Sequence, residues 1–124
     1  MQMLFQWDIT KDDINSVVDR YWANHEEPGA EQEFSNRLVR NTVNHVEDID
    51  RMLERHAENW RLDRMAAVDR NVLRLATEEL VHDATTPASV IINEAIEVAR
   101  RFSAKESPQF INGILDSIRK EVNR

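Results

Sequence analysis

Apolar residues recur at intervals of three and four over nearly the whole of this 124-residue chain. Only two glycines and three prolines are available to interrupt the pattern. A helix buries an apolar stripe with this spacing, whereas β-hairpins rely on glycine in their turns. The sequence therefore predicts an all-α fold. Because a chain of this length supplies one hydrophobic core, we expect residues 1–124 to form a single helical domain.

Six or seven helices are expected, joined by short loops. The helical pattern runs through residues 1–9, 10–22, 30–60, 69–82, 87–102 and 107–122. Within 30–60 the apolar stripe drifts near Asn44. This segment is therefore either one kinked helix or two abutting helices. Thr10 followed by Asp13 resembles a capping box at one helix start, and Ser107-Pro108 marks another start. Phe102 falls on the apolar stripe of its helix, and core packing is the expected role of Trp7, Trp22 and Trp60.

The charge is unevenly distributed. The net charge of −7 argues against a surface that coats nucleic acid non-specifically, because such binding needs a positive field. Residues 100–124, however, hold six Lys and Arg against three Asp and Glu, a net of +3. Arg100 and Arg101 end one predicted helix and Lys105 follows in the loop. They either complement the helix dipole or form an edge that contacts phosphate, beside the helix start at Ser107.

Catalytic and metal-binding patterns are missing from the sequence. There is no cysteine, no Gly-x-Ser-x-Gly elbow and no glycine-rich phosphate loop, so we expect no enzyme and no cofactor. The four histidines, His25, His45, His56 and His82, lack metal-ligand spacing, and we expect no metal site. Nothing resembles a signal peptide, and the apolar runs are far shorter than the ~20 residues of a membrane span. We therefore expect a cytoplasmic protein without a membrane partner.

Gly113 raises a separate question, because it lies inside the predicted helix at 107–122. A glycine there costs roughly 1 kcal/mol of helix stability relative to alanine. Either another backbone packs closely against it, or the missing side chain leaves room for a ligand. Both explanations remain open at this point.

Four segments of the chain form a recognisable set: "LFQWDIT" at 4–10, "VLRLATEEL" at 72–80, "INEAIEVARRF" at 92–102 and "SPQFINGILD" at 107–116. Together they resemble the NusB family of bacterial transcription antitermination factors. The resemblance implies two small three-helix subdomains packed together. It also implies a noncatalytic adaptor that binds the boxA element of nascent ribosomal RNA together with the ribosomal protein NusE. Such an adaptor acts within the RNA polymerase antitermination complex.

The resemblance also implies site residues. Phe110, Asn112, Gly113 and Asp116 match the family signature F-x-N-G-x-L-D, which lies beside the RNA surface. With Arg100, Arg101 and Lys105 they form the predicted RNA-binding set. Glu78 and Glu79 match the helix that faces NusE.

One departure from the family bears on RNA affinity. The family's first helix normally opens with an arginine-rich segment, whereas this chain begins about two residues before the matching "MLFQW". We therefore expect weak RNA binding by the chain as given. The alternative is a protein-interaction or dimerising module, able to form a homodimer, that has lost RNA binding. A third hypothesis is an RNA-targeting domain of the kind that is fused to ribosomal RNA cytosine methyltransferases. We rank it below the others, because this chain has no room for the methyltransferase domain.

Overall fold

The computed structural model describes residues 2–23, 29–57 and 61–124, and within them it contains α-helices, one 3₁₀ turn and no strand. The elements are α1 (Gln2–Thr10), α2 (Ile14–Ala23), α3 (Gly29–Asn44), α4 (Val46–His56), η1 (Leu62–Arg64), α5 (Ala67–His82), α6 (Ala88–Phe102) and α7 (Ser107–Glu121). The prediction of an all-α fold is confirmed. None of the described helices combines the length and apolar character that crossing a bilayer requires.

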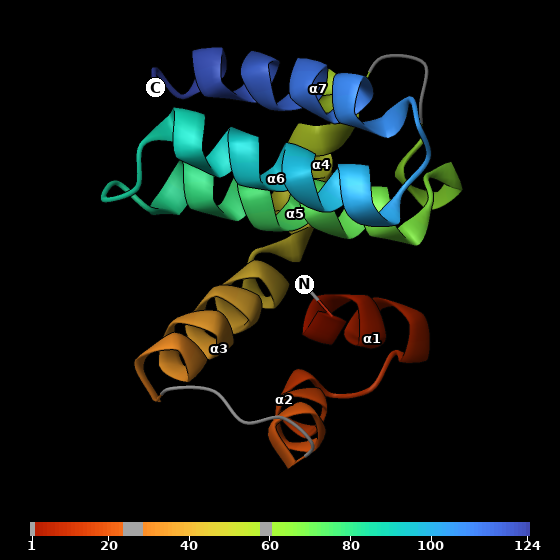
Figure 1. The fold of residues 1–124 in the computed structure, drawn as a ribbon, viewed down its shortest axis with the longest axis vertical. Helices are drawn as coiled ribbons and strands as arrows, with labels where there is room; N and C mark the ends of the chain where they lie inside the picture. The colour runs from red at the N-terminus through yellow and green to blue at the C-terminus, as the bar shows by residue number, and fades with distance from the viewer. Residues whose placement is uncertain (1, 24–28, 58–60) are drawn as a thin grey trace.

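The helices form two groups, each with its own buried cluster (Figure 1). In the first, α1, α2 and α3 bury Met3, Val17, Val18 and Val39. In the second, α5, α6 and α7 lie side by side, and α4 adds Ile49, Leu53 and its C-cap Ala57 to their core. The family resemblance implied three helices in each group, but the second group has four. Helix α5 contacts α1, α3, α4, α6 and α7, so it is the central element.

The long pattern at 30–60 proves to be two helices. Helix α3 ends at Asn44 and α4 begins at Val46, with His45 as the single residue between them. The backbone continues through this junction with hydrogen bonds from His45 N to Asn41 O (3.0 Å) and from Ile49 N to His45 O (2.9 Å). The drift of the apolar stripe near Asn44 therefore marks a helix boundary. Trp60, at the end of the predicted range, lies outside the described residues.

The predicted capping box at Thr10 is wrong, because the cap belongs to Asp13. Asp13 Oδ2 accepts hydrogen bonds from the backbone N–H groups of Asn15 (3.1 Å) and Ser16 (3.3 Å), at the start of α2. Thr10 instead ends α1, where its hydroxyl donates to the carbonyl of Gln6 at 2.8 Å. Lys11 lies in the connection between the two helices and has a φ of 62°.

A buried ionic network joins the two groups of helices. Asp8 on α1 accepts hydrogen bonds from Arg70, Asn71 and Arg74 on α5, and Arg74 also binds Asp50 on α4 through two bonds of 2.9 Å. Burial raises the pKa of the Asp8 carboxyl, but the hydrogen bonds from Arg70, Arg74 and Asn71 outweigh burial and lower the pKa overall. Asp8 is therefore a charged contact at the centre of the fold.

Candidate nucleic-acid interface and partner surface

The three cations predicted to contact phosphate lie where α6 ends and the connection to α7 begins. Arg100 and Arg101 form the last turn of α6, Lys105 lies in the connection, and all three are exposed. Arg100 donates to Glu97 Oε1 at 2.5 Å. Within the described part of the chain, Arg101 and Lys105 form no ion pair. Two of the three charges are thus available to an anion.

Asp69 on α5 anchors the connection that carries Lys105. The hydroxyls of Ser103 and Ser107 both donate to its carboxylate, and the bond from Ser107 to Asp69 Oδ2 is 2.9 Å long. The helix start predicted at Ser107 is confirmed, since α7 begins there, but the Ser107 side chain does not cap the helix. Its hydroxyl is buried against Asp69 instead. This anchoring holds Lys105 on a short, fixed connection.

Two aromatic residues accompany the cations. Phe110 is half-buried, packs against the second core cluster and lines a pocket of about 240 Å³ with Met65 and Ala104. Phe102 lies at the end of the apolar stripe of its helix, as expected, but its side chain is 64% exposed. The buried members of α6 end at Ala99, and the last turn of the helix projects beyond the core. An exposed aromatic ring beside Arg101 suits the stacking of an unpaired base.

The remaining signature residues follow along α7. Asn112 and Gly113 are exposed, and Asp116 is partly exposed one turn further on. Asp116 pairs with Arg119 (2.6 Å) and Lys120 (3.2 Å), and hydrogen bonds from these two side chains lower the pKa of its carboxyl. A carboxylate repels phosphate, so the pairing suits Asp116 to ordering this face of α7 rather than to contacting the RNA backbone.

Gly113 has open space around it. No heavy atom of the described chain lies within 4 Å of the position that a Cβ would take, beyond its own neighbours and helix backbone. Close packing by another part of this chain, one of the two explanations left open, is therefore wrong for the described residues. Room for a ligand remains the prediction.

The two glutamates predicted to face the partner differ in exposure. Glu78 is only 2% exposed, and its carboxylate contacts His45 and His82 within the protein. Glu79 is half-buried and lines an apolar pocket with Leu38, Leu75 and Val98. Burial, with the nearby charges of Asp83 and Glu94, raises the pKa of Glu79 to about 7. Of the pair, only Glu79 is placed to meet a partner directly.

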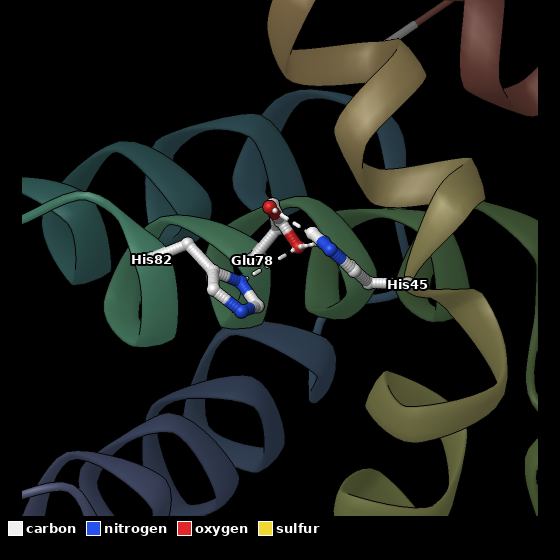
Figure 2. A group of neighbouring side chains, drawn as sticks. All are labelled: His45, Glu78 and His82. Atoms are coloured by element: carbon white, nitrogen blue, oxygen red, sulfur yellow. Dashed lines mark hydrogen bonds and ion pairs between the residues drawn. The ribbon is translucent and has the colours of Figure 1, made fainter.

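The fold brings together one group of side chains that the sequence did not indicate. Glu78 lies between His45, at the junction of α3 and α4, and His82, in the last turn of α5 (Figure 2). The spacing of Glu78 and His82, four residues apart on one helix face, was the available signal. His45 comes from a separate helix junction, 33 residues away in sequence from Glu78, and no local pattern connects them.

Known proteins share the sequence pattern and the fold of this chain. The NusB family model matches residues 1–120. The chain belongs to the NusB family. It is 46% identical to the transcription antitermination protein NusB of Koribacter versatilis (strain Ellin345) over 124 residues, which cover 99% of this chain and 85% of the relative. It is 45% identical to the same protein of Solibacter usitatus (strain Ellin6076) over 124 residues, which cover 98% of this chain and 84% of the relative.

Solved NusB structures agree with the fold described above. A structure of T. maritima NusB matches with a TM-score of 0.90 and 36% identity, covering 97% of this chain and 84% of that chain. A chain in a crystal structure of the antitermination factors NusB and NusE in complex with dsRNA matches with a TM-score of 0.80 and 27% identity, covering 96% of this chain and 89% of that chain. The resemblance drawn from the four sequence segments is confirmed.

Proposed function

We propose that this NusB-family chain is a noncatalytic adaptor in transcription antitermination, which binds boxA RNA of nascent ribosomal transcripts together with a NusE-type ribosomal protein. The observation that carries the proposal is the match, over 96% of the chain, to a structure that holds NusB, NusE and dsRNA. The adaptor acts with the RNA polymerase antitermination complex, and hence in the cytoplasm.

The proposed RNA surface runs from the last turn of α6 onto the exposed side of α7. Arg100, Arg101 and Lys105 supply positive charge at its start, in a chain of net charge −7. Phe110 offers an aromatic edge and Asn112 an amide that can bind a base, and Gly113 allows the RNA backbone to approach α7 closely. Proteins that recognise unpaired RNA bases use this combination of cations, aromatic rings and amides.

The role of the three cations can be tested by fluorescence anisotropy with labelled boxA RNA at several salt concentrations. The variant Arg100→Ala/Arg101→Ala/Lys105→Ala should bind more weakly. Its log-log salt slope should be shallower by about 1.4, since each lost phosphate contact removes roughly 0.7 for single-stranded RNA and two of the three cations are available to make one.

The matched control is Arg20→Ala/Arg51→Ala/Arg55→Ala, which removes the same three charges from exposed positions on α2 and α4. Both variants change the net charge from −7 to −10. The control should keep most of the affinity. Equal losses in the two variants would show that total charge matters and that α6 and its connection are not the RNA site.

The proposed partner surface includes Glu79 and its apolar pocket, in which Leu38, Leu75 and Val98 are only partly covered. Glu94 also lines this pocket, and partly exposed apolar side chains beside a few polar groups are typical of a protein-binding surface. Glu78 is buried, so we do not expect it to touch the partner directly.

Calorimetric titration with a NusE-type protein tests this assignment. Glu79→Lys should reduce the binding heat strongly, whereas Glu47→Lys, the same charge change at an exposed position of α4, should not. Circular dichroism of both variants checks that they are folded. Unchanged binding by folded Glu79→Lys would place the partner elsewhere.

A further inference from the structure

A buried carboxylate and two imidazoles from different elements converge at the junction of α3 and α4 (Figure 2). His45 Nδ1 lies 3.1 Å from Glu78 Oε1 and 3.0 Å from Oε2, and His82 Nδ1 lies 3.1 Å from Glu78 Oε2. The two imidazole rings stack with their centroids 4.3 Å apart and their planes 25° apart. Both rings therefore direct the same nitrogen to one carboxylate.

The separations are close to those of a metal site. Zn²⁺ binds imidazole nitrogen and carboxylate oxygen at about 2.0–2.2 Å, so adjacent ligand atoms in a tetrahedral site lie about 3.3–3.6 Å apart. The observed N–O separations of 3.0 and 3.1 Å are a few tenths of an ångström shorter. One ligand atom from each of the three residues lies within 4.8 Å of the others. Because the two rings stack with their planes only 25° apart, both rings would have to turn for their nitrogens to point at one ion.

The charge of Glu78 favours a cation at this position. Among the described residues, only the two histidines form ion pairs with Glu78, whose side chain is 3% exposed. Buried charges in proteins are usually paired with an opposite charge or coordinate a metal. The buried Asp8 follows the first pattern, with Arg70 and Arg74. Glu78 instead lies beside two histidines, which are common metal ligands, so it fits the pattern of a buried charge that coordinates a metal.

We propose that His45, Glu78 and His82 bind a divalent transition-metal ion of the zinc class. Two imidazoles and one carboxylate form a ligand set that Zn²⁺ uses when it keeps a fourth position open. The side chains of His45 and His82 are 40% and 48% exposed, so that fourth position faces solvent. The proposal rests on these three side chains alone and is independent of RNA or NusE binding.

The surroundings can tolerate the added charge. A pocket of about 210 Å³ adjoins the group, and its lining includes Arg37 from α3 and Asp83 from the end of α5, one charge of each sign. A bound ion would tie His45, the single residue between α3 and α4, to the last turn of α5. Metal binding should therefore stabilise the junction between the two groups of helices.

Calorimetry with ZnCl₂ on metal-free protein, combined with thermal unfolding, tests the proposal. We expect one Zn²⁺ per chain and a higher unfolding midpoint. Removing a ligand in His45→Ala or His82→Ala should weaken Zn²⁺ binding about tenfold or more, since even changes to the groups behind the ligands cost 10–100-fold. Glu78→Gln, which keeps the size of the side chain, should do the same. Visible absorption of bound Co²⁺ should be lost in all three variants.

His56→Ala is the matched control. His56 also contacts one carboxylate, with its Nε2 3.3 Å from Glu121 Oε1, but its Nδ1 binds the Ser117 hydroxyl at 2.6 Å. This variant should bind Zn²⁺ like the unmodified chain. Three results would overturn the proposal: no binding by the unmodified chain, unchanged binding by folded His82→Ala, or an equal loss in His56→Ala.

Discussion

Arg74 Nη1 donates to Asp8 Oδ1 at 3.0 Å and so joins α5 in one group of helices to α1 in the other. Both side chains are buried, with 9% and 5% of their surface exposed. The same guanidinium binds Asp50 and lies 5.8 Å from the centre of the Trp7 ring. The two halves of the molecule are therefore held together by charges that have little access to water.

Replacing Asp8 by asparagine should destabilise the fold by about 3–5 kcal/mol, because it leaves Arg70 and Arg74 buried without their shared anion. Urea unfolding at neutral pH measures this free energy. Asp12→Asn is the control, since Asp12 pairs with Arg20 at 2.7 Å on the surface. Its urea midpoint should hardly change, and similar losses in both variants would contradict the special role of the buried network.

Asp8 should also make the fold sensitive to acid. Its pKa is lower in the folded protein than the ordinary value of 3.8, so its contribution to stability is complete above that pH. The contribution is lost as the pH falls through the lower, folded value. Acid unfolding followed by circular dichroism should show this dependence in the unmodified chain and a weaker one in Asp8→Asn.

We predict that residues 1–124 unfold in one cooperative step. Helix α5 contacts helices of both groups, and the Asp8 network spans the boundary between them. Tryptophan fluorescence and helix content should give the same urea midpoint, since Trp7 and Trp22 report on the first group. Two separate midpoints would mean that the groups are independent units.

Glu79→Gln should stabilise the protein at pH 8 and have little effect at pH 5. The pKa of Glu79 is raised from 4.5 to about 7 in the folded state. Between these values the folded state binds more protons than the unfolded state, so stability falls as the pH rises. Because Glu79 is only half-buried, we expect about 1–2 kcal/mol rather than the full effect of the shift.

Urea unfolding of Glu79→Gln and of the unmodified chain at both pH values provides the measurement. The exposed Glu97→Gln on the neighbouring helix α6 serves as control and should follow the unmodified chain. A Glu79→Gln variant with the same pH dependence as the unmodified chain would refute the raised pKa.

Gly113→Ala separates helix stability from RNA binding. The alanine side chain meets no atom of the described chain within 4 Å, and Gly113 does not have a positive φ. The variant should therefore gain about 0.5–1 kcal/mol of stability by thermal or urea unfolding. If RNA approaches α7 at this residue, affinity for boxA RNA should fall despite the gain. A variant that is less stable would mean that the helix is packed more closely than described.

Local patterns in the sequence were enough to predict the helices, because amphipathic periodicity and helix-start residues act over a few positions. Exposure at the ends of helices was harder to predict. Phe102 continues an apolar stripe, yet the core ends at Ala99. The meeting of His45 with Glu78 could not be predicted, since it depends on how α3, α4 and α5 pack. The family signature indicated Asn112 and Gly113, and the fold adds that both are exposed.

Joint binding of RNA and NusE tests the adaptor role most directly. The measurement is the fluorescence anisotropy of labelled boxA RNA, titrated with this chain alone and with the chain saturated by a NusE-type protein, with scrambled RNA as reference. We predict weak binding by the chain alone, and tighter binding of boxA than of scrambled RNA once NusE is present. Equal affinity for the two RNAs, unchanged by NusE, would contradict the proposed function.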